Sequence, residues 1–198
     1  MVMPEKYDFS YTGFSLRVND MARVAKVLGE GGLIDLEALG EGKTSTGKKR
    51  LNEIGKRLKK LTAKQNGILI DGELQEQRHI AFLSVCKAHL FIRDFSVEVL
   101  REKLLLNDQR ISEGEYVSFF RTKAELYPEM ENLTESSRKK IRQVTFKILE
   151  HAGIINNVKQ RIIQPQLLHQ DVIDAVAEES KEWLKVFLIT DTDLKNIK

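Results

Sequence analysis

The sequence has few cysteines, few prolines and no long apolar run. Its 198 residues include one cysteine, Cys86, so neither an intramolecular disulfide nor a cysteine metal cluster can form. It has only three prolines, so most of the chain is free to form long helices. Apolar runs stay short of the ~20 residues that a membrane-spanning helix needs. Residues 1–10 lack the charged flank and apolar stretch of a signal peptide. We therefore expect a cytoplasmic protein.

Enzyme motifs are also missing. Residues 42–44 read GKT, but the first glycine of a P-loop would then have to stand at position 37, which is Glu37. The four histidines form no HExxH motif, and His79 and His89 fall in core-type helices, where histidines are more often packed than ligating. We therefore expect no enzymatic activity, no metal site and no cofactor.

Charge is abundant but unevenly distributed. The chain carries a net charge of +3, yet residues 43–64 contain nine Lys or Arg and a single acid, Glu53. That segment has a net charge of +8, which leaves the rest of the chain at −5. Such a local excess of positive charge indicates an anionic partner.

Hydrophobic spacing predicts an all-α fold, a mainly helical bundle. Residues 80–106 are apolar on most sides, which is typical of central helices, and we expect two core helices with a break near residues 94–96. Further helices are expected over residues 16–28, 47–60, 112–126, 134–152 and 168–190, with a short element over residues 33–39.

Local signals predict turns and caps between these helices. Asn66-Gly67 predicts a turn, Asp71 a helix cap, and Ser112–Glu115 a capping box. Two β-branched runs around a pair of asparagines predict a small β-hairpin near residues 154–164.

The chain length fits one domain over residues 1–198. Two lobes are the alternative within it. Residues 1–66 would form an N-terminal helical lobe with the first basic helix. Residues 67–198 would hold the core helices, the second basic helix and the C-terminal helix.

Two basic helices resemble each other at an offset of ninety residues. Residues 44–58 read TSTGKKRLNEIGKRL, and residues 134–148 read TESSRKKIRQVTFKI. The shared pattern is a hydroxyl-bearing cap, three consecutive cations and an apolar stripe. Because amphipathic helices converge in pattern, coincidence is the competing explanation, and a basic helix is often only a solvated face.

The chemistry of this pattern favours a bound polyanion. A helix start exposes free backbone N–H groups and carries partial positive charge, so cations there need an external negative charge. A phosphate backbone supplies it, and hydroxyls add contacts to phosphate oxygens. Arg142 and Gln143, one turn further along, are suited to base edges. The residues predicted to contact nucleic acid are Lys43, Thr44, Ser45, Thr46, Lys48, Lys49, Arg50, Lys56, Arg57 and Lys60 in the first helix, Ser136, Ser137, Arg138, Lys139, Lys140, Arg142, Gln143 and Lys147 in the second, and Lys159 and Arg161 in the hairpin.

The second basic helix has a further context. A helix over 112–126, a turn, a helix over 134–152 and a hairpin follow the order of a winged helix-turn-helix. The connection over residues 126–133 is longer than the usual 3–4-residue turn of that motif. In this arrangement the hairpin cations would touch the phosphate backbone beside the groove.

Blocks along nearly the whole chain resemble the BrxA family, accessory proteins of BREX phage-defence systems. They are SYTGFSL, STGKKRLNEIGKRLKKL, RDFSVEVLREKLL and, most specifically, ENLTESSRKKIRQVTFKILEHAGII followed by RIIQPQLL. The resemblance implies an all-helical fold similar to NusB-type antitermination factors and binding of double-stranded DNA. It also implies work beside other BREX proteins, among them a DNA methyltransferase, a large ATPase and a phosphatase-like protein. Catalysis would belong to those partners.

Three hypotheses follow. The first is an accessory protein that binds double-stranded DNA through two basic helices. The second is a protein adaptor whose basic helices, or whose acidic face around Asp171, Asp174 and Glu178, dock on partners. The third is an RNA-binding factor similar to NusB.

Overall fold

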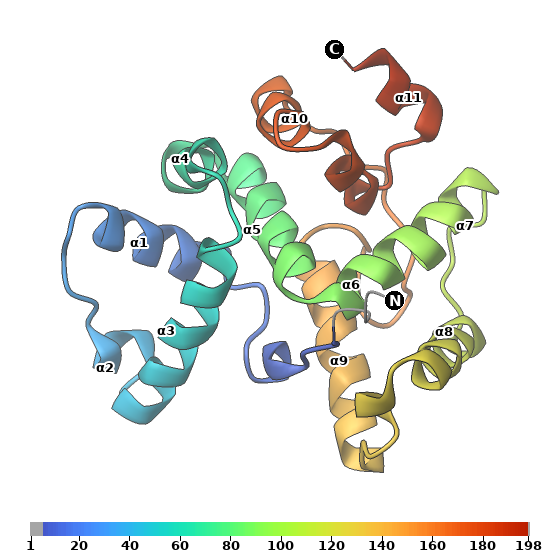
Figure 1. Cartoon of the computed structure of the whole chain (residues 1–198), viewed down its shortest axis with the longest axis horizontal. Coiled ribbons are helices and arrows are strands. Elements are labelled where there is room, and N and C mark those ends of the chain that lie inside the picture. The colour runs from blue at the N-terminus through green and yellow to red at the C-terminus, as the bar shows by residue number, and fades with distance from the viewer. Residues whose placement is uncertain (1–5, 198) are drawn as a thin grey trace.

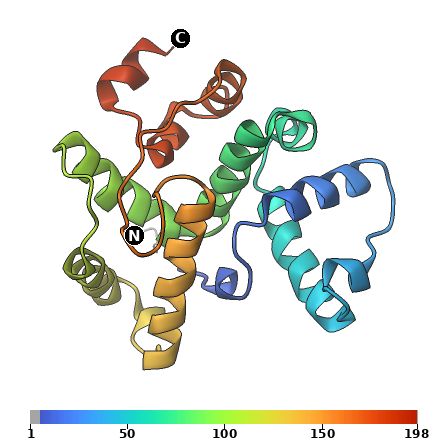
Figure 2. The same ribbon diagram turned by 180° about the vertical axis from the view of Figure 1, so that it is seen from behind.

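The computed structural model describes residues 6–197 and shows an all-α protein, without a β-strand in that range (Figures 1 and 2). The predicted fold class is confirmed. In chain order the elements are η1 (Ser10–Gly13), α1 (Val18–Gly29), α2 (Leu36–Leu39), α3 (Thr44–Leu58), α4 (Ala63–Asp71), α5 (Leu74–Ala88), α6 (Leu90–Phe95), a π-helical turn η2 (Ser96–Arg101), α7 (Glu102–Leu105), α8 (Glu113–Leu126), η3 (Pro128–Met130), α9 (Glu135–His151), α10 (Gln170–Ala177), η4 (Lys181–Phe187) and α11 (Asp191–Asn196).

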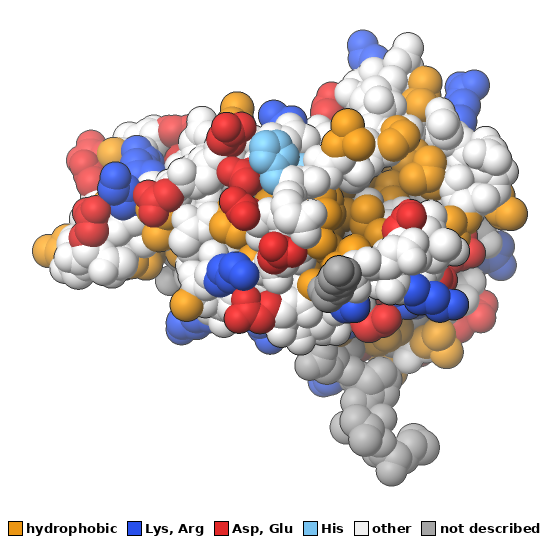
Figure 3. Space-filling model, turned by 90° about the horizontal axis from the view of Figure 1, so that it is seen from above, with side chains coloured by type: hydrophobic (Ala, Val, Ile, Leu, Met, Phe, Trp, Pro, Cys, Tyr) orange, Lys and Arg blue, Asp and Glu red, His pale blue; other side chains and the backbone are white. Residues whose placement is uncertain are grey.

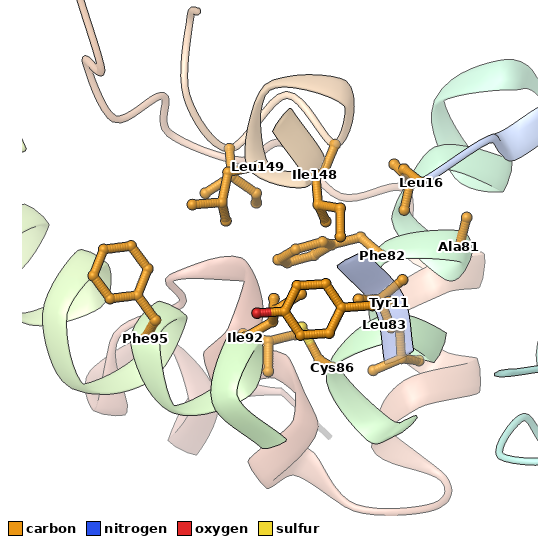
Figure 4. Packing of buried hydrophobic residues seen from close by; sticks show 14 of the residues in the cluster. Tyr11, Leu16, Ala81, Phe82, Leu83, Cys86, Ile92, Phe95, Ile148 and Leu149 are labelled. Carbon is orange, nitrogen blue, oxygen red and sulfur yellow. The ribbon is translucent and has the colours of Figure 1, made fainter. Parts of the chain in front are cut away.

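Helix α5 forms the centre of the fold because it is apolar on most sides. Its residues from Ile80 to Cys86 are fully buried, and it packs against α1, α3, α4, α6, α10 and η4. Figure 4 shows Tyr11 of η1, Phe82 of α5 and Ile148 of α9 packed together within this core. The same core extends from Tyr7 to Leu194. It therefore draws residues from both sides of position 66, which itself lies inside α4.

The break between the central helices lies at His89, so the prediction of a break near residues 94–96 was wrong. His89 has an extended backbone (φ −133°), and its ring lies between the Glu53 carboxylate and the Asp8 carbonyl. At Ser96 the chain widens into a π-helical turn and continues, which keeps its backbone hydrogen-bonded. The break coincides with the contacts of His89 with Glu53 and Asp8. Both residues are distant in the sequence, so no local pattern reveals this break.

Two further local predictions were wrong. Asn66-Gly67 lies inside α4, because a capping box between Thr62 and Gln65 starts that helix and buried Leu69 anchors it. Asp71 ends α4, and the cap of α5 is Glu73 instead, which forms a capping box with Glu76.

The helices around the second basic segment agree with the sequence. The capping box of Ser112 and Glu115 starts α8, which ends at Leu126 before Pro128. Thr134 caps α9 by accepting a hydrogen bond from the backbone N–H of Ser137 at 3.1 Å. In contrast, α3 begins at Thr44 rather than near Gly47, and its N-cap Lys43 makes no side-chain cap. The hydroxyl cap predicted for both basic helices therefore exists only in α9.

The predicted hairpin over 154–164 is absent from the structure. Ile155 and Ile163 form one isolated bridge, but the turn between them is held by side chains. Asn157 Oδ1 accepts from the backbone N–H groups of Lys159 and Gln160 at 3.0 and 2.8 Å, as in an asparagine turn. Backbone hydrogen bonds also join the two sides, from Asn156 N–H to the Ile162 carbonyl at 2.9 Å and from Gln164 N–H to the Ile154 carbonyl at 2.8 Å. The chain therefore doubles back as in a hairpin, but neither side extends into a strand.

The predicted helix over 168–190 is split into α10 and η4, and α11 follows it. Among the described helices, none is both long enough and apolar enough to cross a bilayer.

Candidate nucleic-acid interface

Helix α9 carries its exposed cations on two different faces. Its buried face includes Ile141, Val144 and Ile148, which pack into the core. We use the name phosphate face for a second stripe with i, i+4, i+7, i+11 spacing, which lies on one side of a helix. All members of this stripe are exposed: Ser136, Lys140, Gln143 and Lys147.

The phosphate face is free of the protein's own carboxylates. Lys140 approaches the amide oxygen of Gln143 at 3.5 Å, and neither Lys140 nor Lys147 forms an ion pair with any described residue. Arg138, on the neighbouring face, donates from Nε to the Leu133 carbonyl at 3.1 Å and likewise has no carboxylate partner within residues 6–197. These three cations are therefore available to an external anion.

Other cations of α9 and of the loop after it are paired. Lys139 lies 2.7 Å from Glu135, in an exposed pair that contributes little stability. Arg142 and Arg161 share Glu113, which lies 2.9 Å from Arg161 Nη1. The hydrogen bond from Arg161 and the charges of both arginines lower the pKa of Glu113. Two arginines and one glutamate give this cluster a net charge of +1. Lys159, in the loop after α9, is exposed.

Helix α3 presents a smaller set of free cations. Lys48 and Lys49 are exposed and make no ion pair with the described part of the chain. Arg50 is half-buried, lies 3.0 Å from Glu41 and donates to the Leu39 carbonyl at 2.7 Å, so it holds α2 against α3. The remaining exposed candidates at this helix are Lys43, Thr44, Ser45 and Lys60, and Thr46 is half-buried.

Arg57 was predicted to contact nucleic acid, but its side chain is fully buried and so is not part of an exposed interface. Its Nε lies 3.0 Å from Glu53 Oε1, and its terminal nitrogens donate to the carbonyls of Phe14 and Ser15 at 2.9 and 3.0 Å. Lys56 is paired with Asp8. Both cations hold residues 8–15, here called the N-terminal arm, against α3, so both are engaged within the protein.

The two basic helices begin at the same end of the molecule. In both ribbon views the first turns of α3 and α9 lie toward the lower edge, with η1 between the helices (Figures 1 and 2). The opposite end, seen in Figure 3, has acidic, basic and hydrophobic side chains interspersed. The N-terminal turns of both helices therefore lie toward one end of the protein.

Sequence reasoning missed Arg121 on α8. It is exposed, lies one turn after exposed Val117, and borders a groove with Arg138 and Arg142 of α9. The i, i+4 spacing of an exposed valine and an arginine was the available signal.

These observations define an all-α protein with exposed cations just after the first turns of two helices. Within residues 6–197, His, Cys, Asp and Glu side chains form no group that could hold a metal ion. A sequence model of the BrxA family matches residues 5–180, and the chain therefore belongs to the BrxA family. The resemblance seen in the sequence is confirmed.

Two relatives add to this assignment. The chain is 26% identical over 106 residues to the BREX protein BrxA of Bacillus cereus (strain H3081.97), which covers 53% of this chain and 53% of that protein. The match thus spans about half the length of this curated relative. The crystal structure of an uncharacterized protein from Magnetospirillum magneticum has a TM-score of 0.78 at 17% identity, covering 93% of this chain and 98% of that one. This likeness shows the fold alone. A helix-turn-helix role and a likeness to NusB-type factors stay predictions.

Proposed function

We propose that this BrxA-family protein is a non-enzymatic accessory factor of a BREX phage-defence system that binds the phosphate backbone of double-stranded DNA. The observation that supports it is the phosphate face of α9. Two lysines and two neutral polar side chains form an exposed stripe there, with no described carboxylate paired to it. Lysines that are not neutralised within the protein favour a polyanionic ligand.

The first turn of α9 adds backbone donors to this stripe. Thr134 occupies the N–H of Ser137, which leaves the N–H groups of Glu135 and Ser136 free at the positive end of the helix dipole. Glu135 opposes an anion there, but its pairing with Lys139 offsets its charge. A phosphate therefore fits beside Ser136 and Lys140.

Helix α3 supplies the second contact in this proposal. Lys48 and Lys49 lie in the second turn of α3, and its first turn contains no acidic residue. Because α3 and α9 both begin toward the lower edge of the molecule in Figure 1, we expect one duplex to meet both helices. Neutral Gln143 on the same stripe as the lysines is suited to base edges.

The test is a titration of a fluorescent 20-base-pair duplex by anisotropy at several salt concentrations. With about five phosphates contacted, the slope of log K against log salt is expected near −4 to −5. Lys140→Gln combined with Lys147→Gln should reduce the magnitude of that slope by about 2, since each lost phosphate contact removes about 0.9. The matched control is Lys195→Gln, an exposed lysine of α11 without an ion pair among the described residues, at the opposite end of the molecule from the starts of α3 and α9 in Figure 1; it should change the slope by less than about half a unit.

An unchanged affinity in the double variant, with an unchanged melting temperature, would refute the assignment of this face. Competition between the duplex and a structured RNA of equal length separates DNA binding from RNA binding, and preference for RNA would contradict the proposal. Other BREX components are the proposed protein partners, and catalysis is assigned to them.

A further inference from the structure

A groove opens between α8 and α9, beside the phosphate face but on a different side of α9. It has a volume of about 310 Å³. Arg138, at the rim of this groove, and Lys140 of the phosphate face are two residues apart, so they point in different directions from the helix. The α8–α9 groove is lined by Tyr116, Val117, Phe120 and Arg121 of α8 and by Glu135, Arg138, Lys139 and Arg142 of α9. Its one carboxylate, Glu135, is paired with Lys139, so the three arginines leave the rim basic.

The floor of the α8–α9 groove is apolar. Val117 is 43% exposed, which leaves an aliphatic side chain uncovered at the surface. Phe120 and Tyr116 are buried beneath it, so their rings offer little open face. A nucleobase needs an open ring face to stack on, whereas an aliphatic side chain needs only apolar surface to be buried against. The floor therefore favours an apolar side chain over a base.

Arginines stand on both sides of this floor. Arg121 is exposed and forms no ion pair among the described residues. The Arg138 guanidinium lies 5.8 Å from the centre of the Phe120 ring. Its Nε is fixed by the Leu133 carbonyl, which leaves its terminal nitrogens free. Guanidinium groups bind carboxylates through two parallel hydrogen bonds, so the rim is complementary to acidic side chains.

We infer that the α8–α9 groove is a docking site for an acidic segment of a partner protein. The segment places an aliphatic side chain on Val117 and carboxylates on Arg121 and Arg138. Peptide recognition of this kind combines a small apolar anchor with a polar rim. The inference goes beyond the proposed function, because the phosphate face lies on another side of α9 and stays open to DNA while the groove is occupied.

The test is an unbiased selection from a random peptide library displayed on phage, with the immobilised full chain as bait. We expect enrichment of peptides with Leu, Ile, Val or Met between Asp or Glu residues. This enrichment should disappear on Val117→Asp and on Arg121→Glu. A synthetic peptide from the selection should bind Arg121→Glu at least tenfold more weakly than the unchanged protein. Both positions are exposed, so the variants should keep the melting temperature.

Ser118→Asp is the matched control. Ser118 is exposed on α8 next to Val117 but is not part of the groove, so the same peptides should be retained. Enrichment of non-acidic peptides, no enrichment, or equal enrichment on Arg121→Glu would overturn the inference. Loss of duplex binding in Val117→Asp would assign the groove to nucleic acid and also overturn it. Lys140→Gln with Lys147→Gln should keep the peptides, which separates this test from that of the proposed function.

Discussion

The replacement Glu53→Gln tests the buried ion network that fixes the N-terminal arm to α3. Glu53 is 6% exposed, and its Oε1 lies 3.0 Å from Arg57 Nε and 2.5 Å from His89 Nε2. Its Oε2 accepts from the Ser10 hydroxyl at 2.9 Å. The replacement keeps the shape of the side chain but leaves the buried Arg57 charge without a carboxylate partner. Breaking a buried pair in this way costs about 3–5 kcal/mol.

The depressed pKa of Glu53 corresponds to a similar contribution to the free energy of unfolding. Burial by itself raises the pKa of Glu53, but the hydrogen bond from His89 and the charge of Arg57 outweigh it and hold the pKa at about 2, below its ordinary value of 4.5. A shift of this size corresponds to roughly 3 kcal/mol of stability. Because the folded-state pKa is depressed, this contribution is fully present above pH 4.5 and is lost as the pH falls toward 2.

Urea unfolding followed by circular dichroism measures both effects. At pH 7 we expect Glu53→Gln to lower the free energy of unfolding by about 3 kcal/mol, a shift of the midpoint by more than about 1 M for a chain of this size. The difference between the two proteins should shrink as the pH falls below 4.5. Glu41→Gln, which removes an exposed partner of Arg50, is the control and should change little. A difference at pH 7 below about 1 kcal/mol, or one that stays constant into acid, would refute the reasoning.

Three further predictions can be checked by the same unfolding assay. Gly47→Ala should destabilise by about 2–3 kcal/mol, since a Cβ there would lie 1.8 Å from the Leu36 carbonyl oxygen. A Cβ at Gly55 in the same helix would meet nothing within 4 Å, so Gly55→Ala should stabilise by up to about 1 kcal/mol. If Gly47→Ala were instead the more stable of the two variants, the close packing of α2 on α3 would be contradicted. Tyr116→Phe removes a buried hydroxyl without a hydrogen-bond partner among the described residues, so stability should stay within about 1 kcal/mol or rise, and a larger loss would indicate a hidden partner. Thr134→Ala removes the cap of α9 and should cost about 1 kcal/mol, whereas no loss would show that the cap is dispensable.

The candidate interface could be predicted only in part. The cations at the starts of α3 and α9 stand out in the sequence, and Lys48, Lys140 and Lys147 are exposed in the structure. Arg57 has the same charge and lies on the same helix as Lys48, but the carbonyls of Phe14 and Ser15 enclose it. Those partners are more than forty residues away, and a pattern within one helix cannot reveal them.

What the amino-acid sequence determined by itself is the set of features that depend on near neighbours. The apolar run through α5, the capping box at Ser112 and the cap at Thr134 involve residues within four positions, so they can be recognised before folding. The tertiary structure decided which charges remain free. It placed the helix break at His89, buried Arg57 beneath the arm, and set Arg121 beside the cations of α9. Burial and pairing depend on segments far apart in the chain, and only folding brings those segments together.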